Sequence, residues 1–274
     1  MSLSIETVEP GVRRLRLRSW QGTAVGYEVS AYLLDDVLVD TGFAHARAAM
    51  LGAVGVLRPK GVVVTHWHED HAGNVPALAA TGLPMLMHEA CEAQLRSHPA
   101  IRLYRRIVWG QTQPLSQAIE PFDPAPLVVI PAPGHSPDHV VVWDGERRIL
   151  VSGDLFLGVK VRIAHDHETP RRLVGPLRAM AALEPKLLLD AHRGVVADGA
   201  AQLRAKADWT EEQIASIERL AAEGVGVDQI VRRLFEGESF VGRLSGGEYS
   251  RAGFVRAVLH DSEREDSVNR SGER

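Results

Sequence analysis

The sequence predicts an α/β fold with two similar halves, in which strands alternate with helices and polar residues follow the strands. Residues 3–40 alternate apolar and polar side chains, as half-buried strands do. Later apolar runs such as Gly61–Val64 lead into helical patterns, as in strand–helix–strand units. Histidines and aspartates follow such runs in both halves of the chain. We therefore expect the two halves to face each other and to bring their strand ends to one edge.

Composition places the chain among ordinary globular proteins. Its 274 residues are 45% hydrophobic and 24% charged, enough for one large domain with a small appendage. The net charge of −4 gives no overall attraction for nucleic acid and leaves a local basic patch open. The single cysteine, Cys91, excludes an internal disulfide and is expected to be a core thiol. Because residues 1–20 resemble an amphipathic strand rather than an export signal, we expect a cytoplasmic protein without a membrane partner.

Patterning predicts the elements of the first half in order. Strands are expected at 12–18, 28–34 and 37–40, with a turn at Asp35-Asp36. A helix over 43–57 should end before Pro59. A strand at 61–65, a helix at 74–80, a strand at 85–88 and a helix at 89–96 follow.

Residues 97–126 have no clear period and are expected to form a long excursion over the mouth of the site. The sequence leaves open whether its side chains, such as Tyr104, Arg105 and Trp109, contact a substrate or pack on their own domain. Beyond it the expected elements are strands at 127–130, 140–143, 148–151 and 186–189 and a helix at 171–183.

Past residue 200 the pattern becomes helical, with helices expected at 205–223, 227–235 and 248–260. This change predicts a larger domain of residues 1–204, a helical appendage of residues 205–260 that resembles a winged-helix-like unit, and a disordered tail of residues 261–274. The appendage is expected to act either as a lid that grips substrate or as a buttress or dimer contact. Oligomeric state stays open, a homodimer included.

The strongest motif is His66-Trp67-His68-Glu69-Asp70-His71, which directly follows an apolar strand. His66 and His68 are two residues apart, so in extended backbone they point the same way and can hold one cation. Asp70 and His71 lie where the chain should turn into a helix, which could aim them at a neighbouring second position.

This loop resembles the signature of the metallo-β-lactamase-fold hydrolases. Three later segments resemble that family's remaining ligand loops: Pro133-Gly134-His135, Ser152-Gly153-Asp154 and Asp190-Ala191-His192. The resemblance implies a four-layer αβ/βα sandwich and two bound divalent metal ions, with zinc expected and iron or manganese also compatible with the ligands. It implies that His66, His68 and His135 hold one metal, that Asp70, His71 and His192 hold the other, and that Asp154 bridges them.

Several other polar residues have two interpretations. Asp40 either orients a ligand histidine from beneath the metals, as the resemblance implies, or caps a turn. His165 and His167 look like ligands, but the seven ligand positions are already filled. We therefore expect them in the substrate pocket or on the surface, with the surface favoured. The histidines outside these loops are expected to be ordinary: His45, His88, His98, His139 and His260.

The implied activity is hydrolysis of a small ester, thioester, lactone or phosphoester by a hydroxide that bridges the two metals. Asp70 is also expected to be catalytic, by accepting or passing on a proton. One alternative is an endonuclease for single-stranded RNA, whose backbone Arg102, Arg105 and Arg106 would contact. A small-molecule substrate is favoured over nucleic acid. Another alternative is a persulfide-type dioxygenase with a single iron, against which the filled second site counts.

Overall fold

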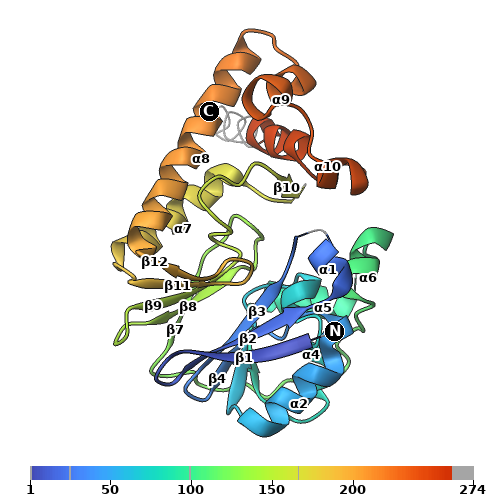
Figure 1. Ribbon diagram of the computed structural model, residues 1–274, viewed down its shortest axis with the longest axis vertical. Coiled ribbons are helices and arrows are strands. Elements are labelled where there is room, and N and C mark those ends of the chain that lie inside the picture. Colours follow the sequence, from blue (N-terminus) through green and yellow to red (C-terminus); the bar gives the residue numbers. More distant parts are fainter. Residues whose placement is uncertain (1, 25, 99, 166, 261–274) are drawn as a thin grey trace, which may run out of the picture.

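Two β-sheets pack face to face and carry helices on their outer faces (Figure 1). The structure is a computed structural model that describes residues 2–24, 26–98, 100–165 and 167–260. One sheet has the strand order β1-β2-β3-β4-β5-β6 and the other the order β12-β11-β9-β8-β7. This arrangement confirms the predicted four-layer α/β fold. The predicted tail of residues 261–274 lies outside the described residues.

The first half of the chain forms the six-stranded sheet and its helices. Its strands are β1 (Ser2–Glu9), β2 (Val12–Arg18), β3 (Val29–Leu34), β4 (Val37–Val39), β5 (Gly61–Val63) and β6 (Met85–Leu86). Its helices are α1 (Trp20–Ala24), α2 (Arg47–Leu57), α3 (Glu69–Ala72), α4 (Val75–Ala79), α5 (Glu89–Ser97) and α6 (Leu103–Trp109), with a 3-10 turn at Ala44–Ala46. β1 to β4 pair antiparallel, whereas β4, β5 and β6 run parallel.

The second half forms the five-stranded sheet and the C-terminal helices. Its strands are β7 (Val128–Pro131), β8 (Val140–Asp144), β9 (Ile149–Gly153), β11 (Leu187–Asp190) and β12 (Gly194–Ala197). The helices are α7 (Pro170–Ala182), α8 (Gly199–Ala222), α9 (Val227–Phe235) and α10 (Phe240–Leu244), and residues 251–260 are also helical. Two short strands, β10 (Ala164–His165) and β13 (Tyr249–Ser250), pair with each other.

Alternation along the central strands sorts side chains into separate cores. On β4, Val37 and Val39 join the core between the sheets, whereas Leu38 joins the core beneath the first set of helices. On β9, Val151 joins the core between the sheets and Leu150 joins the one beneath α7 and α8. Successive strand residues point to opposite faces, so a strand covered on both sides is apolar throughout. Three cores therefore separate the four layers.

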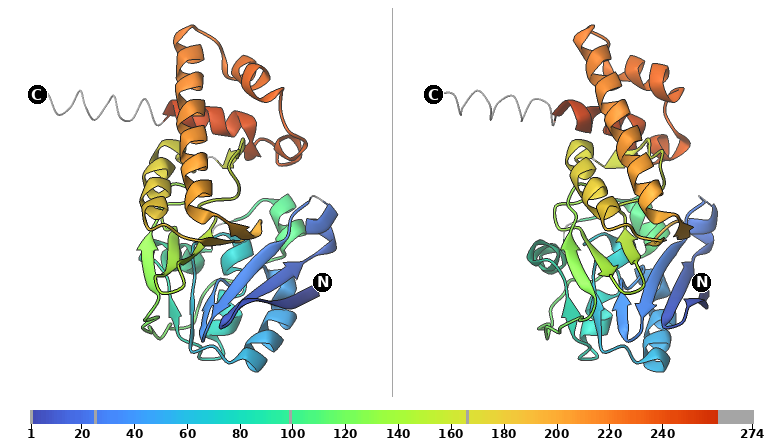
Figure 2. Two further views of the ribbon diagram at one scale, coloured as in Figure 1. Left: turned by 60° about the vertical axis from the view of Figure 1, so that its left-hand side comes forward. Right: turned by 90° about the vertical axis from the view of Figure 1, so that its left-hand side faces the viewer.

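Helix α8 links the second sheet to the C-terminal helices (Figure 2). Leu203 and Ala207, near its start, pack in the core of the second sheet, whereas Ile214 and Ile217 pack with α9 and the last helix. The predicted boundary after residue 204 therefore falls inside one continuous helix, which begins at Gly199 rather than at 205. Across the described ranges, α8 included, no helix is both long enough and apolar enough to cross a membrane.

Two predicted segments differ from the structure. The 97–126 excursion contains helix α6, which the pattern missed because its exposed face carries Leu103 and Ile107 while its buried face carries Arg105. The helix predicted over 248–260 begins only after β13, whose pairing with β10 orders residues 249–250 as a strand. A two-residue strand is too short to show a period.

Candidate metal centre

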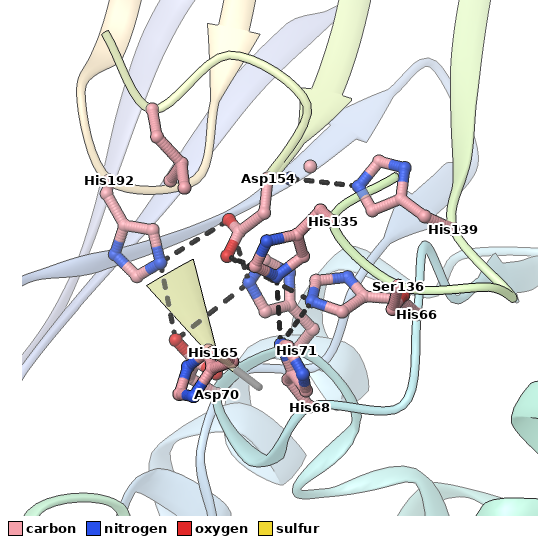
Figure 3. Close-up of polar contacts among 12 residues, drawn as sticks. His66, His68, Asp70, His71, His135, Ser136, His139, Asp154, His165 and His192 are labelled. Atoms are coloured by element: carbon pink, nitrogen blue, oxygen red, sulfur yellow. Dashed lines mark hydrogen bonds and ion pairs between the residues drawn. The ribbon is translucent and has the colours of Figure 1, made fainter. Parts of the chain in front are cut away.

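All seven predicted ligand residues lie together at one edge of the two sheets (Figure 3). Asp70 and His71 lie on helix α3, and the other five come from the loops that follow β5, β7, β9 and β11. Their donor atoms form two groups, and within each group these atoms lie within 4.8 Å of one another. One group contains His66, His68, His135 and Asp154, and the other contains Asp70, His71 and His192. The grouping coincides with the division between two metals that the family resemblance implies.

Asp154 belongs to the first group and also faces the second (Figure 3). Its Oδ2 atom is 3.4 Å from His135 Nε2 in the first group. Its Oδ1 atom is 3.2 Å from His71 Nε2 and 3.4 Å from His192 Nε2 in the second group. One carboxylate can therefore serve both positions, one oxygen for each.

The donor spacing suits a first-row divalent cation. His68 Nδ1 lies 3.0 Å from both His66 Nε2 and His135 Nε2, and His192 Nε2 lies 3.3 Å from Asp70 Oδ2. Ligand atoms about 2.1 Å from a tetrahedral zinc ion lie about 3.4 Å from each other. Nitrogen and carboxylate oxygen donors also suit zinc, iron or manganese.

Buried polar atoms without a hydrogen-bond partner also indicate a metal site. His71 Nε2 and Asp154 Oδ1 are buried and have no hydrogen-bond partner among the described residues. Leaving a buried polar atom unpaired is costly, and each such atom in a native structure calls for an explanation. A cation held between these two atoms would satisfy both, so the residues present fit a metal.

Hydrogen bonds to Asp40 hold His71 and Thr65 in place. The Asp40 Oδ2 atom accepts a hydrogen bond from His71 Nδ1 at 2.7 Å and another from the Thr65 hydroxyl at 2.8 Å. Its Oδ1 atom accepts the Thr65 backbone N–H at 2.7 Å. Of the two predicted roles for Asp40, the structure shows the orienting one. Fixing the Nδ1 proton leaves His71 Nε2 free to bind a metal.

His139 supports Asp154 in a way that was not predicted. The Asp154 backbone N–H donates to His139 Nε2 at 3.0 Å. Burial, helped by the neighbouring His135, lowers the pKa of His139 to about 3, so its ring is neutral and can accept. Gly153 makes room for the ring, since its φ is +49° and a Cβ there would lie 2.8 Å from His139 Nε2. The prediction that His139 is ordinary is wrong, and its place in the His135 loop was the available indication.

His165 and His167 lie at the site, so the favoured prediction of a surface position is wrong. His167 Nε2 is 3.0 Å from Nε2 of His68, and His165 lines the cavity beside the ligands. The His165 ring stacks on Tyr249 with centroids 4.4 Å apart. The pairing of β10 with β13 holds this segment over the site. That pairing joins distant parts of the chain, so local sequence could not indicate it.

Burial and neighbouring charges set the protonation of the cluster. Burial, reinforced by nearby imidazoles, holds the pKa of both His66 and His68 well below its ordinary value. Burial alone would raise the pKa of Asp154, but His71 and His192 hold it well below its usual range. Burial alone would lower the pKa of His71 and His192, but Asp154 holds both well above their ordinary value, so a cation bound there would displace a proton from each ring.

Helix α6 contacts both residues 66–71, which we call the metal loop, and Glu248 in the C-terminal part of the chain. Arg105, which is buried, pairs with Glu69 at 2.5 Å and with Glu248 at 3.4 Å. Arg102 pairs with Glu248 at 3.2 Å. Two of the three arginines considered for RNA binding are therefore paired within the protein.

A cavity of about 470 Å³ opens beside the ligands. His68, Asp70, His135, Asp154 and His192 contribute to its wall. Further lining residues come from α6 and from the C-terminal part of the chain: Tyr104, Arg105, Val108, Trp109, Ser239, Val241, Leu244, Tyr249 and Arg251. The excursion and the appendage thus both help to enclose the space where a substrate would meet the cluster.

Comparisons with known proteins agree with this geometry. The sequence profile of the metallo-beta-lactamase superfamily matches residues 25–192. The chain is 31% identical to the probable metallo-hydrolase YybB of Bacillus subtilis over 134 residues, which cover 46% of this chain and 60% of that one. It is 35% identical to a hydroxyacylglutathione hydrolase of Anaeromyxobacter dehalogenans over 137 residues, or 48% of each chain. The matches therefore span less than two thirds of these relatives.

A solved structure shows the same fold over nearly the whole chain. A metallo-beta-lactamase family protein from Thermus thermophilus aligns with a TM-score of 0.67 at 19% identity, covering 95% of both chains. At this identity the likeness concerns the fold alone. With the profile match over more than half of its length, the chain belongs to the metallo-beta-lactamase superfamily.

Proposed function

We propose that this protein is a metal-dependent hydrolase of small thioesters or esters that works with two divalent metal ions, zinc first among them. The observation that carries the proposal is the position of Asp154, whose two carboxylate oxygens face two separate groups of buried donors. A cavity beside these donors offers room for a small substrate.

The residues of this chain would have three roles in the reaction: metal binding, proton transfer and exclusion of water. Divalent cations, when bound, lower the pKa of water and polarise a carbonyl. His66, His68 and His135 would hold one cation and Asp70, His71 and His192 the other, with Asp154 shared. Asp70, which lines the cavity 3.3 Å from His192 Nε2, would take a proton from the attacking water and pass it to the leaving group. The aromatic and aliphatic residues of the cavity wall would exclude bulk water.

Thioesters are favoured within this substrate range because of one relative. The hydroxyacylglutathione hydrolase that shares 35% identity with this chain is named for cleaving an acylated thiol. The superfamily match over residues 25–192 contains every proposed ligand of this chain. Lactones and phosphoesters are the comparison substrates against which this preference is tested.

The test combines metal analysis with a substrate panel. We expect purified protein to contain about two divalent metal ions per chain and to hydrolyse a thioester faster than a lactone, a phosphodiester or a phosphotriester. A chelator should abolish turnover, and added zinc should restore it. The variant Asp154→Asn should lose both metal and activity.

A matched histidine variant controls for general damage. His98→Asn alters a histidine outside the cluster whose left-handed backbone, with a φ of 47°, suits asparagine. We expect its metal content and activity to equal those of the parent. Hydrolysis that survives complete metal removal would refute the proposal, and a single iron per chain without hydrolysis would point to oxygenase chemistry instead.

A further inference from the structure

The cavity beside the metal cluster carries an excess of positive side chains. Lys160, Arg162, Arg193 and Arg251 line it, in addition to the buried Arg105. The acidic residues among its lining are Asp70 and Asp154, both assigned above as metal ligands. The chain as a whole has a net charge of −4, so this excess is local.

No carboxylate of the described residues neutralises these four side chains. Within the described ranges, none of them forms an ion pair, whereas Arg105 pairs with two glutamates. Arg193 Nε donates to the Leu157 carbonyl at 2.9 Å, and Arg251 Nη1 donates to backbone carbonyls. No described carboxylate therefore offsets their charges. They come from three segments that are separate in the sequence, and all three converge on one space.

The opposite half of the chain contributes a different kind of surface to the cavity. Tyr27, Tyr104 and Trp109 line it from α6 and from the segment before β3. The Tyr27 ring meets Trp109 edge-on with centroids 6.5 Å apart and meets His192 in the same way at 5.9 Å. This aromatic surface lies directly beside a proposed metal ligand and suits an uncharged acyl or aryl group.

We propose that the substrate is an anionic thioester or ester whose carboxylate or phosphate is bound by Lys160, Arg162 and Arg193. Its uncharged acyl group would lie against Tyr27 and Trp109, which places the scissile carbonyl beside Asp154. Water adds its oxygen to the acyl carbon, the bond from that carbon to sulfur breaks, and the released thiol takes a proton, so nothing is oxidised or reduced. This inference rests on the proposed hydrolase function and names its substrate class.

Matched thioesters test the charge preference. We would compare phenylacetyl thioesters of N-acetylcysteamine, which is neutral, of 3-mercaptopropionate, which carries a carboxylate, and of phosphopantetheine, which carries a phosphate. We expect kcat/KM for at least one anionic thioester to exceed that for the neutral one by about tenfold or more, and the advantage to shrink with added salt. The relative rates of the two anionic substrates would tell carboxylate from phosphate.

Charge-removing variants locate the effect. In the double variant Lys160→Gln/Arg162→Gln, the ratio of anionic to neutral kcat/KM should fall toward one. Arg106→Gln removes one charge from an exposed residue of α6 outside the cavity and should leave the ratio unchanged. Equal kcat/KM for neutral and anionic thioesters, or a ratio that the double variant does not lower, would overturn the inference while leaving the hydrolase intact.

Binding to metal-free protein separates this inference from the proposed function. Uncleavable thioether analogues of the three substrates would be titrated calorimetrically into protein stripped of metal. Tighter binding of an anionic analogue than of the neutral one supports the charge preference, and equal binding overturns it. If the metal-loaded protein hydrolyses none of the thioesters, the proposed function fails, even where the analogues still show the preference.

Discussion

Arg105 on α6 and Glu69 in the metal loop form a buried ion pair, with 2.5 Å between Nη2 and Oε2. The two side chains are 7% and 3% exposed. Glu69 stands between the proposed ligands His68 and Asp70. The pair therefore attaches α6 to the segment that supplies most of the proposed ligands.

Replacing Arg105 while Glu69 is kept should destabilise the protein strongly. Arg105→Met leaves the Glu69 carboxylate buried without its partner, and we expect a loss of about 3 kcal/mol in the free energy of unfolding. Urea denaturation measures it. Arg178, whose side chain is 40% exposed and pairs with Asp208 and Glu211, is the control, and Arg178→Met should cost about 1 kcal/mol or less. Equal losses in the two variants would contradict the prediction.

Removing the negative charge of Asp40 should weaken metal binding without removing a ligand. Asp40→Asn removes the carboxylate that accepts the His71 Nδ1 proton, so we expect affinity for zinc to fall about 10- to 100-fold. Competition with a chromophoric chelator gives the affinity. Asp144→Asn is the matched control, because Asp144 is also buried but pairs with Arg147. If both variants bind zinc as tightly as the parent, Asp40 does not act through His71.

A cluster of arginines around Glu28 should make stability depend on acid pH. Burial raises the pKa of Glu28, but hydrogen bonds from Arg16, Arg14 and Arg18 outweigh burial and lower it from 4.5 to about 2. A carboxyl group with a depressed pKa stabilises the fold above its unfolded pKa, and this contribution is lost as pH falls from 4.5 to about 2. Allowing for solvent screening, we expect about 1 to 2 kcal/mol.

Unfolding measured across this pH range tests the Glu28 prediction. Glu28→Gln should be less stable than the parent at pH 7, and the difference should disappear near pH 2. Glu212→Gln, at an exposed position on α8, should follow the parent at every pH. A difference between Glu28→Gln and the parent that persists unchanged at pH 2 would refute the proposed cause.

Lys206 should make stability rise with pH as well, but in the alkaline range. Its Nζ atom is buried and donates to the carbonyls of Leu155 and Phe156, just after Asp154. Burial lowers the pKa of Lys206 from 10.5 to about 8. Between these values the unfolded chain binds more protons than the folded protein, so this group makes stability rise with pH, on the order of 2 kcal/mol. Urea denaturation at pH 7.5 and 10 should show that rise in the parent but not in Lys206→Met.

The sequence predicts the ligand loops well because each is a local motif that directly follows an apolar run. His66 and His68 could be named from their spacing, and Asp154 and His192 from the resemblance of their loops to those of the family. The contacts that support them could not be predicted in this way. His139 meets Asp154 across 15 positions and His71 meets Asp40 across 31, so both contacts depend on how the loops pack.

The layers of the fold were predictable for a similar reason, since strands covered on both faces are apolar throughout. Helix α6 was not, because its buried face carries Arg105, whose ion pair with Glu69 places a charge where an apolar residue would be expected. The strand pair β10–β13 joins two-residue segments from distant parts of the sequence, with His165 opposite Tyr249. Such a separation is beyond the range of any local periodicity.

The pairing of β10 with β13 also affects the order in which the site forms while the chain is being synthesised. Tyr249 and Ser250 leave the ribosome after every proposed ligand has been synthesised, yet they hold the segment that brings His165 and His167 over the cluster. A nascent chain would therefore gather its metal ligands first and close one wall of its cavity last. Ribosome-bound chains that end before residue 249 would be expected to capture metal while their cavity still stands open.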